Sequence, residues 1–129
     1  MHLDDLYAYC LARRGAWEDT PFGPDTLVFK VGKKMFGLIG LEREPMGIAL
    51  KSDPERWLEL REQYDGIVRG PYMDGTHWNT VLLKSDVPAS EIRDLVDRSH
   101  ALVIVGMTRA ARAALDAEAP EASGGDASA

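Results

Sequence analysis

The first residues of the chain carry the hydrophobic spacing of an amphipathic helix. Apolar side chains recur at intervals of three and four residues, at Leu3, Leu6, Tyr7, Cys10 and Leu11. This spacing marks one face of a helix with a 3.6-residue period. Gly15 is a common type of helix terminator, and two prolines within residues 19–25 then exclude regular structure. We predict a helix that begins at Leu3 and ends before Gly15, followed by an irregular connection.

Three β-strands are predicted in the next part of the chain. Residues 27–31 and 34–41 are rich in β-branched, aromatic and other apolar side chains, a composition that favours strands. The two-residue step Gly32-Lys33 between them fits a hairpin turn. Glu44-Pro45 interrupts the second strand, and residues 47–51 make a third. This stretch is therefore predicted to form antiparallel sheet.

The second half of the chain contains a helix, two strands and a last helix. Asp53 and Pro54 fit the N-cap and the first position of a helix, whose inner face would be Trp57, Leu58, Leu60 and Tyr64. Strands are predicted over residues 67–69 and 78–83. Pro88 opens the last helix, and its apolar stripe is Ile92, Leu95, Val96, Ser99, Leu102 and Val103.

The resulting order is helix, three strands, helix, two strands, helix, which indicates an α+β fold. Such an order suits two layers, an antiparallel sheet with its helices gathered on one face. The opposite sheet face would then be open. We expect a single domain over residues 1–115 and a disordered, acidic tail rich in Ala, Gly and Ser over residues 116–129.

The composition is typical of a globular cytoplasmic protein. Of the 129 residues, 45% are hydrophobic and 28% are charged. No apolar segment approaches the length of a membrane span, and Asp4 and Asp5 interrupt any signal-peptide pattern. Cys10 is the single cysteine of the sequence and can form no internal disulfide. Its place on the apolar side of the first helix predicts a core thiol in a reducing compartment rather than a reactive one.

The distribution of charge leaves room for a nucleic-acid surface. The net charge is −6 at pH 7, but residues 1–115 contain 17 acids against 15 bases, because four acids lie in the tail. Six basic residues fall on or beside the predicted strands, namely Lys30, Lys33, Lys34, Lys51, Arg69 and Lys84. If they share the open sheet face or the first hairpin, they would contact the phosphates of DNA. The alternative is that lysines on edge strands prevent aggregation.

Residues 72–80 concentrate aromatic and polar side chains in one short stretch. His77 is a candidate general base, but the chain has no serine elbow, Cys-His signature or paired carboxylates to complete a catalytic site, so we predict a protein that is not an enzyme. In a structural role, Trp78 would anchor its strand in the core while His77 and Asn79 bond the turn backbone. A third alternative is a pocket for a small molecule or a protein partner, lined by Phe22, Trp57, Tyr72, His77, Trp78 and Asn79.

The sequence predicts neither a metal nor a cofactor. His2, His77 and His100 are scattered without the spacing of zinc ligands. The glycines form no phosphate-binding or dinucleotide-binding motif, and Gly23 and Gly32 are assigned to turns.

Several motifs taken together resemble the MmcQ/YjbR family. In chain order they are Pro21-Phe22-Gly23-Pro24, the hairpin over residues 28–36, Leu50-Lys51-Ser52-Asp53-Pro54-Glu55, Tyr72-Met73 and His77-Trp78-Asn79-Thr80-Val81. The resemblance covers roughly residues 3–107. It implies a fold similar to that of type III secretion chaperones, which pair up, so the protein would be a monomer or a homodimer. It also implies DNA binding through a double-wing arrangement of hairpins.

Two details of the resemblance concern binding. Family members usually carry Asn and Lys where this chain has Asp74-Gly75-Thr76, and an acid at this turn removes a phosphate contact. The family is also described as YjbR/CyaY-like, and this frataxin-like relation would place an iron-binding acidic ridge at Asp4, Asp5, Glu18 and Asp19. Acids near a first helix are ordinarily a cap or a solvated face.

Overall fold

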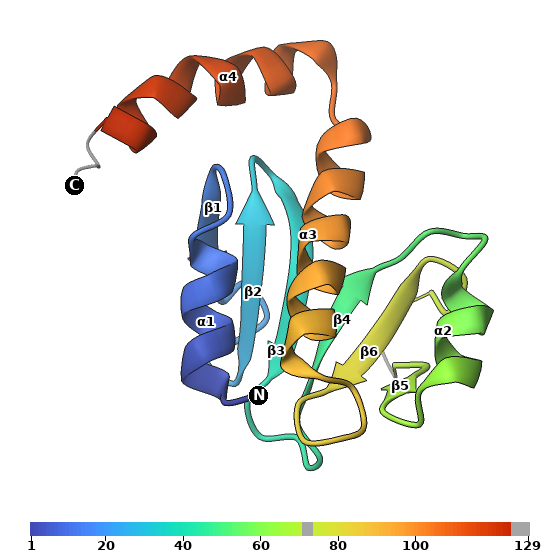
Figure 1. Cartoon of the computed structure of the whole chain (residues 1–129). Helices are drawn as coiled ribbons and strands as arrows, with labels where there is room; N and C mark the ends of the chain where they lie inside the picture. The colour runs from blue at the N-terminus through green and yellow to red at the C-terminus, as the bar shows by residue number, and fades with distance from the viewer. Residues whose placement is uncertain (71–73, 125–129) are drawn as a thin grey trace.

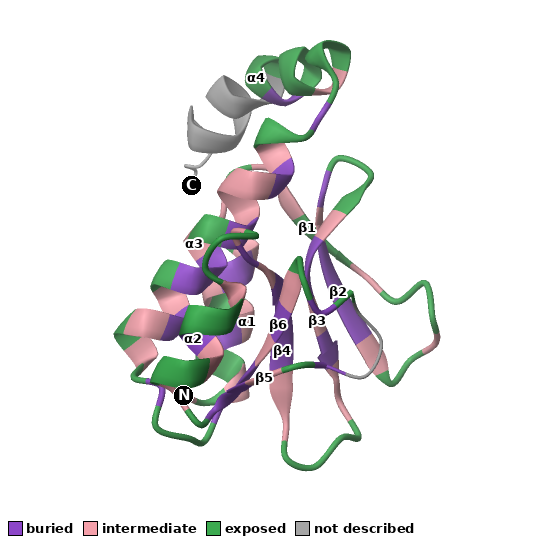
Figure 2. Cartoon of the chain, turned by 90° about the vertical axis from the view of Figure 1, so that its right-hand side faces the viewer, coloured by how far each residue is buried: buried purple, intermediate pink, exposed green. Residues whose placement is uncertain are grey.

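The computed structural model describes residues 1–70 and 74–124. The elements are, in chain order, α1 (Leu3–Leu11), β1 (Ala16–Asp19), β2 (Thr26–Val31), β3 (Lys34–Gly40), β4 (Gly47–Lys51), α2 (Trp57–Gln63), β5 (Ile67–Val68), β6 (Trp78–Leu82), α3 (Ala89–Val105) and α4 (Arg109–Gly124). The strands form one sheet in the order β1-β2-β3-β4-β6-β5, and all neighbours are antiparallel. Helices α1, α2 and α3 lie on one face of this sheet, and α4 crosses the end of the molecule (Figures 1 and 2). The predicted α+β fold is confirmed.

The hairpin between β2 and β3 forms where the sequence predicts it. Val31 pairs with Lys34, so Gly32 and Lys33 are the two turn residues. Gly32 has a φ of 60°, a left-handed conformation that suits glycine and the first central position of a type II′ turn. The turn therefore holds Lys33 and Lys34 at the tip of the hairpin, where both are exposed.

The core lies between the sheet and helices α1 and α3. Phe29 and Phe36 from the sheet are fully buried with Leu6 from α1 and Ile92 from α3. Burial of each such side chain stabilises the fold by roughly 1.5–3 kcal/mol. Cys10 belongs to this core, and burial raises the pKa of its thiol to about 12, which confirms the prediction of a core thiol. Among the described residues, no helix combines the length and the apolar character needed to cross a bilayer.

β1 is a strand that the hydrophobic pattern does not reveal. The sequence predicts an irregular connection over residues 19–25 and no strand between it and Gly15, yet residues 16–19 pair with β2, with Trp17 opposite Lys30. The strand is only four residues long and includes two acids, which have low β propensity. It forms because β2 supplies the backbone partners, and this pairing is not encoded in the local sequence.

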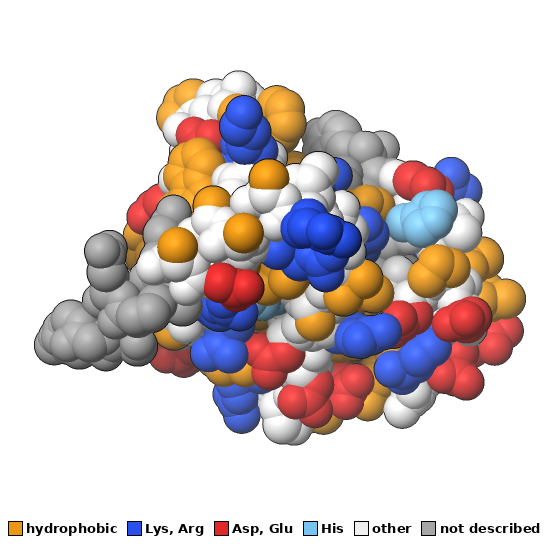
Figure 3. Space-filling view, turned by 90° about the horizontal axis from the view of Figure 1, so that it is seen from above, with side chains coloured by type: hydrophobic (Ala, Val, Ile, Leu, Met, Phe, Trp, Pro, Cys, Tyr) orange, Lys and Arg blue, Asp and Glu red, His pale blue; other side chains and the backbone are white. Residues whose placement is uncertain are grey.

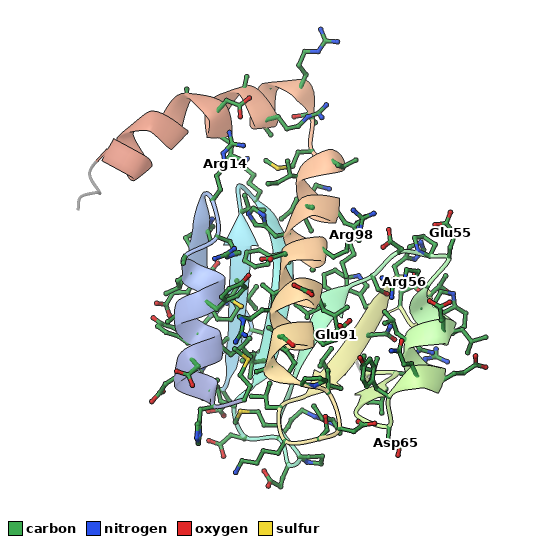
Figure 4. The ribbon with its side chains drawn as sticks, in the orientation of Figure 1. Arg14, Glu55, Arg56, Asp65, Glu91 and Arg98 are labelled. Atoms are coloured by element: carbon green, nitrogen blue, oxygen red, sulfur yellow. The ribbon has the colours of Figure 1, made fainter. Side chains whose placement is uncertain are left out.

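The start of α2 also differs from the prediction. The helix begins at Trp57, after a turn in which Arg56 N–H donates to the carbonyl of Asp53. The Asp53 carboxylate instead accepts hydrogen bonds from Nε and Nη2 of Arg98, at 2.9 and 2.6 Å, so the N-cap assignment of Asp53 is wrong. Figure 4 shows Arg98 on the side of α3 that faces the connection into α2. This pair ties α3 to the end of β4.

Residues 116–124, which the sequence assigns to a disordered tail, belong to a helix, α4, that follows α3. α4 continues to Gly124, and Thr108 caps it, because Ala111 N–H donates to Thr108 Oγ1 at 3.1 Å. Leu115 is buried against the body of the protein, and Arg14 reaches from the end of α1 toward α4 to pair with Asp116 (Figure 4). These contacts and the high helix propensity of alanine account for the helix. Residues 125–129 of the predicted tail lie outside the described residues.

Candidate functional site

The structure separates the six basic residues that the sequence groups together. Lys33 and Lys34 are exposed at the β2–β3 turn, and Lys51 is half-buried at the end of β4. Lys84 lies at the opposite end of the sheet, because Leu82 pairs with Gly47, the first residue of β4. Arg69 follows β5, at the edge of the sheet. These residues therefore do not form one continuous surface.

Lys30 lies on the open sheet face, but its charge is already compensated. Its neighbours Phe29 and Val31 point into the core, so the alternation of a strand directs Lys30 to the other face. There its Nζ lies 3.2 Å from a carboxylate oxygen of Asp19 and 5.0 Å from the centre of the Trp17 ring. Both partners come from β1, the strand that the sequence does not predict, so Lys30 is held across the β1–β2 pair.

Two arginines missed by sequence reasoning join Lys33 and Lys34. The corner between α3 and α4 packs on the hairpin: a Cβ at Gly32 would lie 3.1 Å from Met107 Cε, and Gly32, Met107 and Ala111 line a cavity of about 160 Å³. The first turns of α4 thus place exposed Arg109 and Arg112 at the same end of the molecule as the hairpin tip. No local signal reveals this proximity, because it depends on how α4 docks. We call Lys33, Lys34, Arg109 and Arg112 the cationic end.

The cationic end is not neutralised by acids of the described residues. None of its four side chains forms an ion pair within residues 1–70 and 74–117. The acid of α4 nearest in sequence, Asp116, pairs with Arg14. Figure 3 looks onto this end and shows Lys and Arg side chains in the middle of the view, with acidic side chains gathered mainly along its lower side. The arrangement presents exposed cations to solvent.

The second predicted site, residues 72–80, begins with residues that cannot be placed. Tyr72 and Met73 lie outside the described residues. Asp74 organises the turn that follows: its carboxylate accepts a hydrogen bond from Thr76 N–H at 2.9 Å and lies 2.6 Å from His77 Nδ1. The hydrogen bond from Thr76 N–H is the larger cause, and the contact with His77 the second, of a pKa of Asp74 that lies below its ordinary value. The acid that departs from the family pattern is thus a structural part of the turn.

Arg61 of α2 fixes the rest of this stretch, and no sequence motif indicates it. Its Nε donates to Asn79 Oδ1 at 2.6 Å, and Nη2 donates to the carbonyl of Gly75. The guanidinium carbon lies 4.6 Å from the centre of the Trp57 ring. Asn79 is 3% exposed and also donates from Nδ2 to the Trp57 carbonyl at 3.3 Å. Asn79 is thus a buried structural residue, but it bonds the backbone of α2 and the side chain of Arg61, not the turn backbone that the sequence predicts.

The structure corrects the interpretation of Trp78 and separates Phe22 from the other predicted pocket residues that it describes. Trp78 is half-buried and pairs with Lys51, whereas its neighbour Asn79 points toward the helices; the prediction of Trp78 as a core anchor is wrong. Phe22 is 68% exposed between β1 and β2, at the edge of the sheet opposite Trp57. A cavity of about 480 Å³ lies elsewhere, between α1 and the start of α3, with Tyr9 and Arg93 in its wall.

The predicted acidic ridge is partly engaged in other contacts. Glu18 accepts a hydrogen bond from the Tyr7 hydroxyl, and Asp19 pairs with Lys30. Asp4 and Asp5 lie in the first turn of α1, where acids interact favourably with the helix dipole. Within the part of the chain that the structure describes, no group of three or more His, Cys, Asp or Glu side chains is arranged to hold a metal ion.

Comparisons with known proteins agree with this architecture. The YjbR family model matches residues 11–102. The uncharacterized protein YbdF of Escherichia coli O157:H7 is 37% identical over 89 residues, which cover 69% of this chain and 73% of that protein. The uncharacterized protein YjbR of Escherichia coli K12 is 29% identical over 100 residues, which cover 78% of this chain and 85% of that protein.

Solved structures show the same fold. The crystal structure of the Deinococcus radiodurans protein DR2400, with domain DUF419, has a TM-score of 0.80 and 38% identity and covers 88% of this chain and 87% of that one. A crystal structure of a Pseudomonas syringae protein has a TM-score of 0.69 and 28% identity and covers 79% of this chain and 98% of that one. The matched sequence and fold therefore show that the chain belongs to the YjbR family.

Proposed function

We propose that the protein binds the phosphate backbone of DNA through the cationic end, without catalysis. The observation that carries this proposal is the docking of α4 beside the β2–β3 turn, which adds Arg109 and Arg112 to Lys33 and Lys34. All four side chains are exposed, and none is paired with an acid within residues 1–70 and 74–117. Exposed Lys and Arg side chains neutralise phosphates and release the counterions condensed on the duplex.

The proposed contacts position the protein on the backbone and do not read a base sequence. The hairpin tip and the start of α4 offer exposed cations, and no exposed Asn or Gln lies beside them to make the bidentate amide contacts that distinguish adenine. The expected binding is therefore independent of sequence and weakens with salt. Four phosphate contacts would give a slope of about −3.6 in a plot of log K against log salt concentration.

The test is a titration of a labelled DNA duplex by fluorescence anisotropy at several salt concentrations. Lys34→Glu is expected to weaken binding and to make the salt slope shallower by about 1. Arg109→Glu is expected to have the same effect, although it lies on a different element. The matched control is Lys84→Glu, the same charge change at the opposite end of the sheet, which is expected to leave the slope unchanged.

The outcomes separate a localised interface from a general charge effect. Equal losses for Lys34→Glu and Lys84→Glu would indicate that net charge alone governs the affinity and would overturn the proposal. Absence of binding by the unmodified protein at micromolar concentration and low salt would overturn it as well. A single-stranded probe of the same length tests the shape of the partner, because four cations on two rigid elements suit a duplex of fixed phosphate spacing.

A further inference from the structure

We propose that Arg61 and Arg69 form a second, separate binding site, for the oxyanion group of a small ligand. The group would be a phosphate or a carboxylate, since both are anions that accept charge-assisted hydrogen bonds from guanidinium groups. The site lies beneath α2 at the β5–β6 edge of the sheet, far along the sheet order from the β2–β3 hairpin.

The two arginines meet at Gly75. Arg61 reaches from α2 and donates from Nη2 to the Gly75 carbonyl. Arg69 lies against the other side of the same residue, because a Cβ at Gly75 would be 2.7 Å from Arg69 Nε and 3.0 Å from its Cδ. Both guanidinium groups therefore lie beside Gly75. They are within about one Debye length (~10 Å) of each other, so their charges interact. Glycine at position 75 is what permits this close approach.

The strand register explains why Arg69 faces α2. Val68 pairs with Thr80 on β6, and Thr80 alternates with Asn79 and Val81, which point toward the helices. Arg69, which follows Val68, therefore projects toward the helices, beside Asn79 of β6. Arg61 binds Asn79 on that same side. Helix α2, which precedes β5, and the chain that follows β5 thus direct their arginine side chains to the same place.

The positive charge of this pair is matched only in part, by Asp74, whose carboxylate interacts electrostatically with Arg69. Arg61 donates to neutral acceptors, namely Asn79 Oδ1 and the carbonyls of Gly75 and Trp78. Burial lowers the pKa of Arg61, and the charge of Arg69 lowers it further. Asp74 is the acid facing the pair, and its oxygens are engaged by Thr76 N–H and His77 Nδ1. Neither arginine forms an ion pair with any described residue.

The two arginines have different roles. Arg61 is half-buried and stacked on Trp57, so it is already oriented by the fold and loses little freedom on binding. Arg69 is exposed and makes no hydrogen bond to another described residue, so the fold does not require its charge. Two arginines held together, with Asp74 as the acid beside them and its oxygens already engaged, favour the binding of an anion between them. The fixed arginine would orient the anion and the exposed one would close over it.

The experiment is an NMR titration of the full chain at constant ionic strength with inorganic phosphate and, in a second arm, with malonate. The amide signal of Gly75 and the Nε signals of Arg61 and Arg69 are the probes. Saturable shifts with phosphate alone identify a phosphate site, and saturable shifts with malonate alone identify a carboxylate site. No saturable shift at these three probes with either anion, up to tens of millimolar, would overturn the proposal.

Two variants locate the site. Arg69→Gln retains the fold contacts of Arg61 and is expected to weaken binding ~10-fold, the typical cost of one charge-assisted hydrogen bond. Arg56→Gln, which removes an exposed arginine paired with Glu59 just before α2, is the matched control and should leave the affinity unchanged. Equal affinities of Arg69→Gln and the unmodified protein would overturn the proposal. DNA binding should be unaffected by Arg69→Gln, so the two proposals can fail separately.

Discussion

Leu115 of α4 packs directly on the backbone of Gly15. A Cβ at Gly15 would overlap Leu115 Cδ1, and Gly15 has a φ of 69°, a left-handed conformation that costs other residues free energy. The contact is supported by the neighbouring pair Arg14 and Asp116. It fixes the place of α4 and, through α4, the place of Arg109 and Arg112 beside the hairpin tip.

Gly15→Ala is expected to lower the free energy of unfolding by about 1–3 kcal/mol, because it combines backbone strain with a steric overlap. Urea denaturation measures this change. Gly106→Ala is the control: Gly106 has a φ of −81°, and a Cβ there would make only ordinary van der Waals contacts with the Val103 and Leu102 carbonyl oxygens, at 3.6 and 3.7 Å, so stability should hold or rise by up to ~1 kcal/mol. A fully stable Gly15→Ala variant would show that α4 does not depend on this contact.

Arg61→Ala is expected to lower the free energy of unfolding by about 2–3 kcal/mol, because the buried Asn79 amide and the Gly75 carbonyl lose a charged donor. Arg56 lies near the same helix, but it is exposed and pairs only with exposed Glu59. Arg56→Ala should therefore change the free energy of unfolding by no more than ~0.5 kcal/mol. Thermal and urea unfolding of both variants test the difference. Similar effects of the two substitutions would contradict a structural role of Arg61.

Two buried serines should respond oppositely to removal of their hydroxyl groups. Ser99 Oγ donates to the Phe36 carbonyl at 2.7 Å and accepts from Lys51 N–H at 2.9 Å, so Ser99→Ala leaves two backbone groups unsatisfied and should cost about 1–3 kcal/mol. Ser52 Oγ is buried without a partner among the described residues. Ser52→Ala should therefore be neutral or stabilising by up to ~1 kcal/mol. Chemical denaturation of the two variants measures the difference. A larger loss of stability in Ser52→Ala than in Ser99→Ala would contradict these roles of the two hydroxyl groups.

The stability of the fold should fall in acid, in part through Asp86. The backbone N–H groups of Asp65 and Gly66 both donate to its carboxylate at 2.8 Å, and they hold the pKa of Asp86 below its ordinary value. A carboxyl group whose folded pKa is lowered stabilises the fold above its unfolded pKa of about 3.9, and this contribution is lost as the pH falls toward the folded pKa. Urea midpoints between about pH 6 and pH 3 should therefore decline less steeply in Asp86→Asn. An identical decline in both proteins would exclude Asp86 as a contributor.

Much of the fold could be predicted from local patterns, because side-chain periodicity reports which face of an element is buried. The stripe of Leu3, Leu6 and Cys10 marks α1, and Gly32-Lys33 marks the hairpin turn, since few residues accept a positive φ. β1 escaped this reasoning because its strand state depends on β2. The faces of Trp78 and Asn79 could not be assigned either, since a shift of one residue exchanges the two sides of a strand. The burial of Asn79 requires Arg61, which arrives from α2.

The sequence by itself determined the α+β architecture, the family resemblance and much of the core, through spacing that each segment carries within itself. Only the tertiary structure decided which charges act together. It placed Asp19 against Lys30 and sent Lys84 to the far end of the sheet. It also brought Arg109 to the hairpin tip and Arg69 to Arg61. The physical reason is that electrostatic interactions depend on distance in space, and strand order, register and helix docking set that distance between residues far apart in the chain.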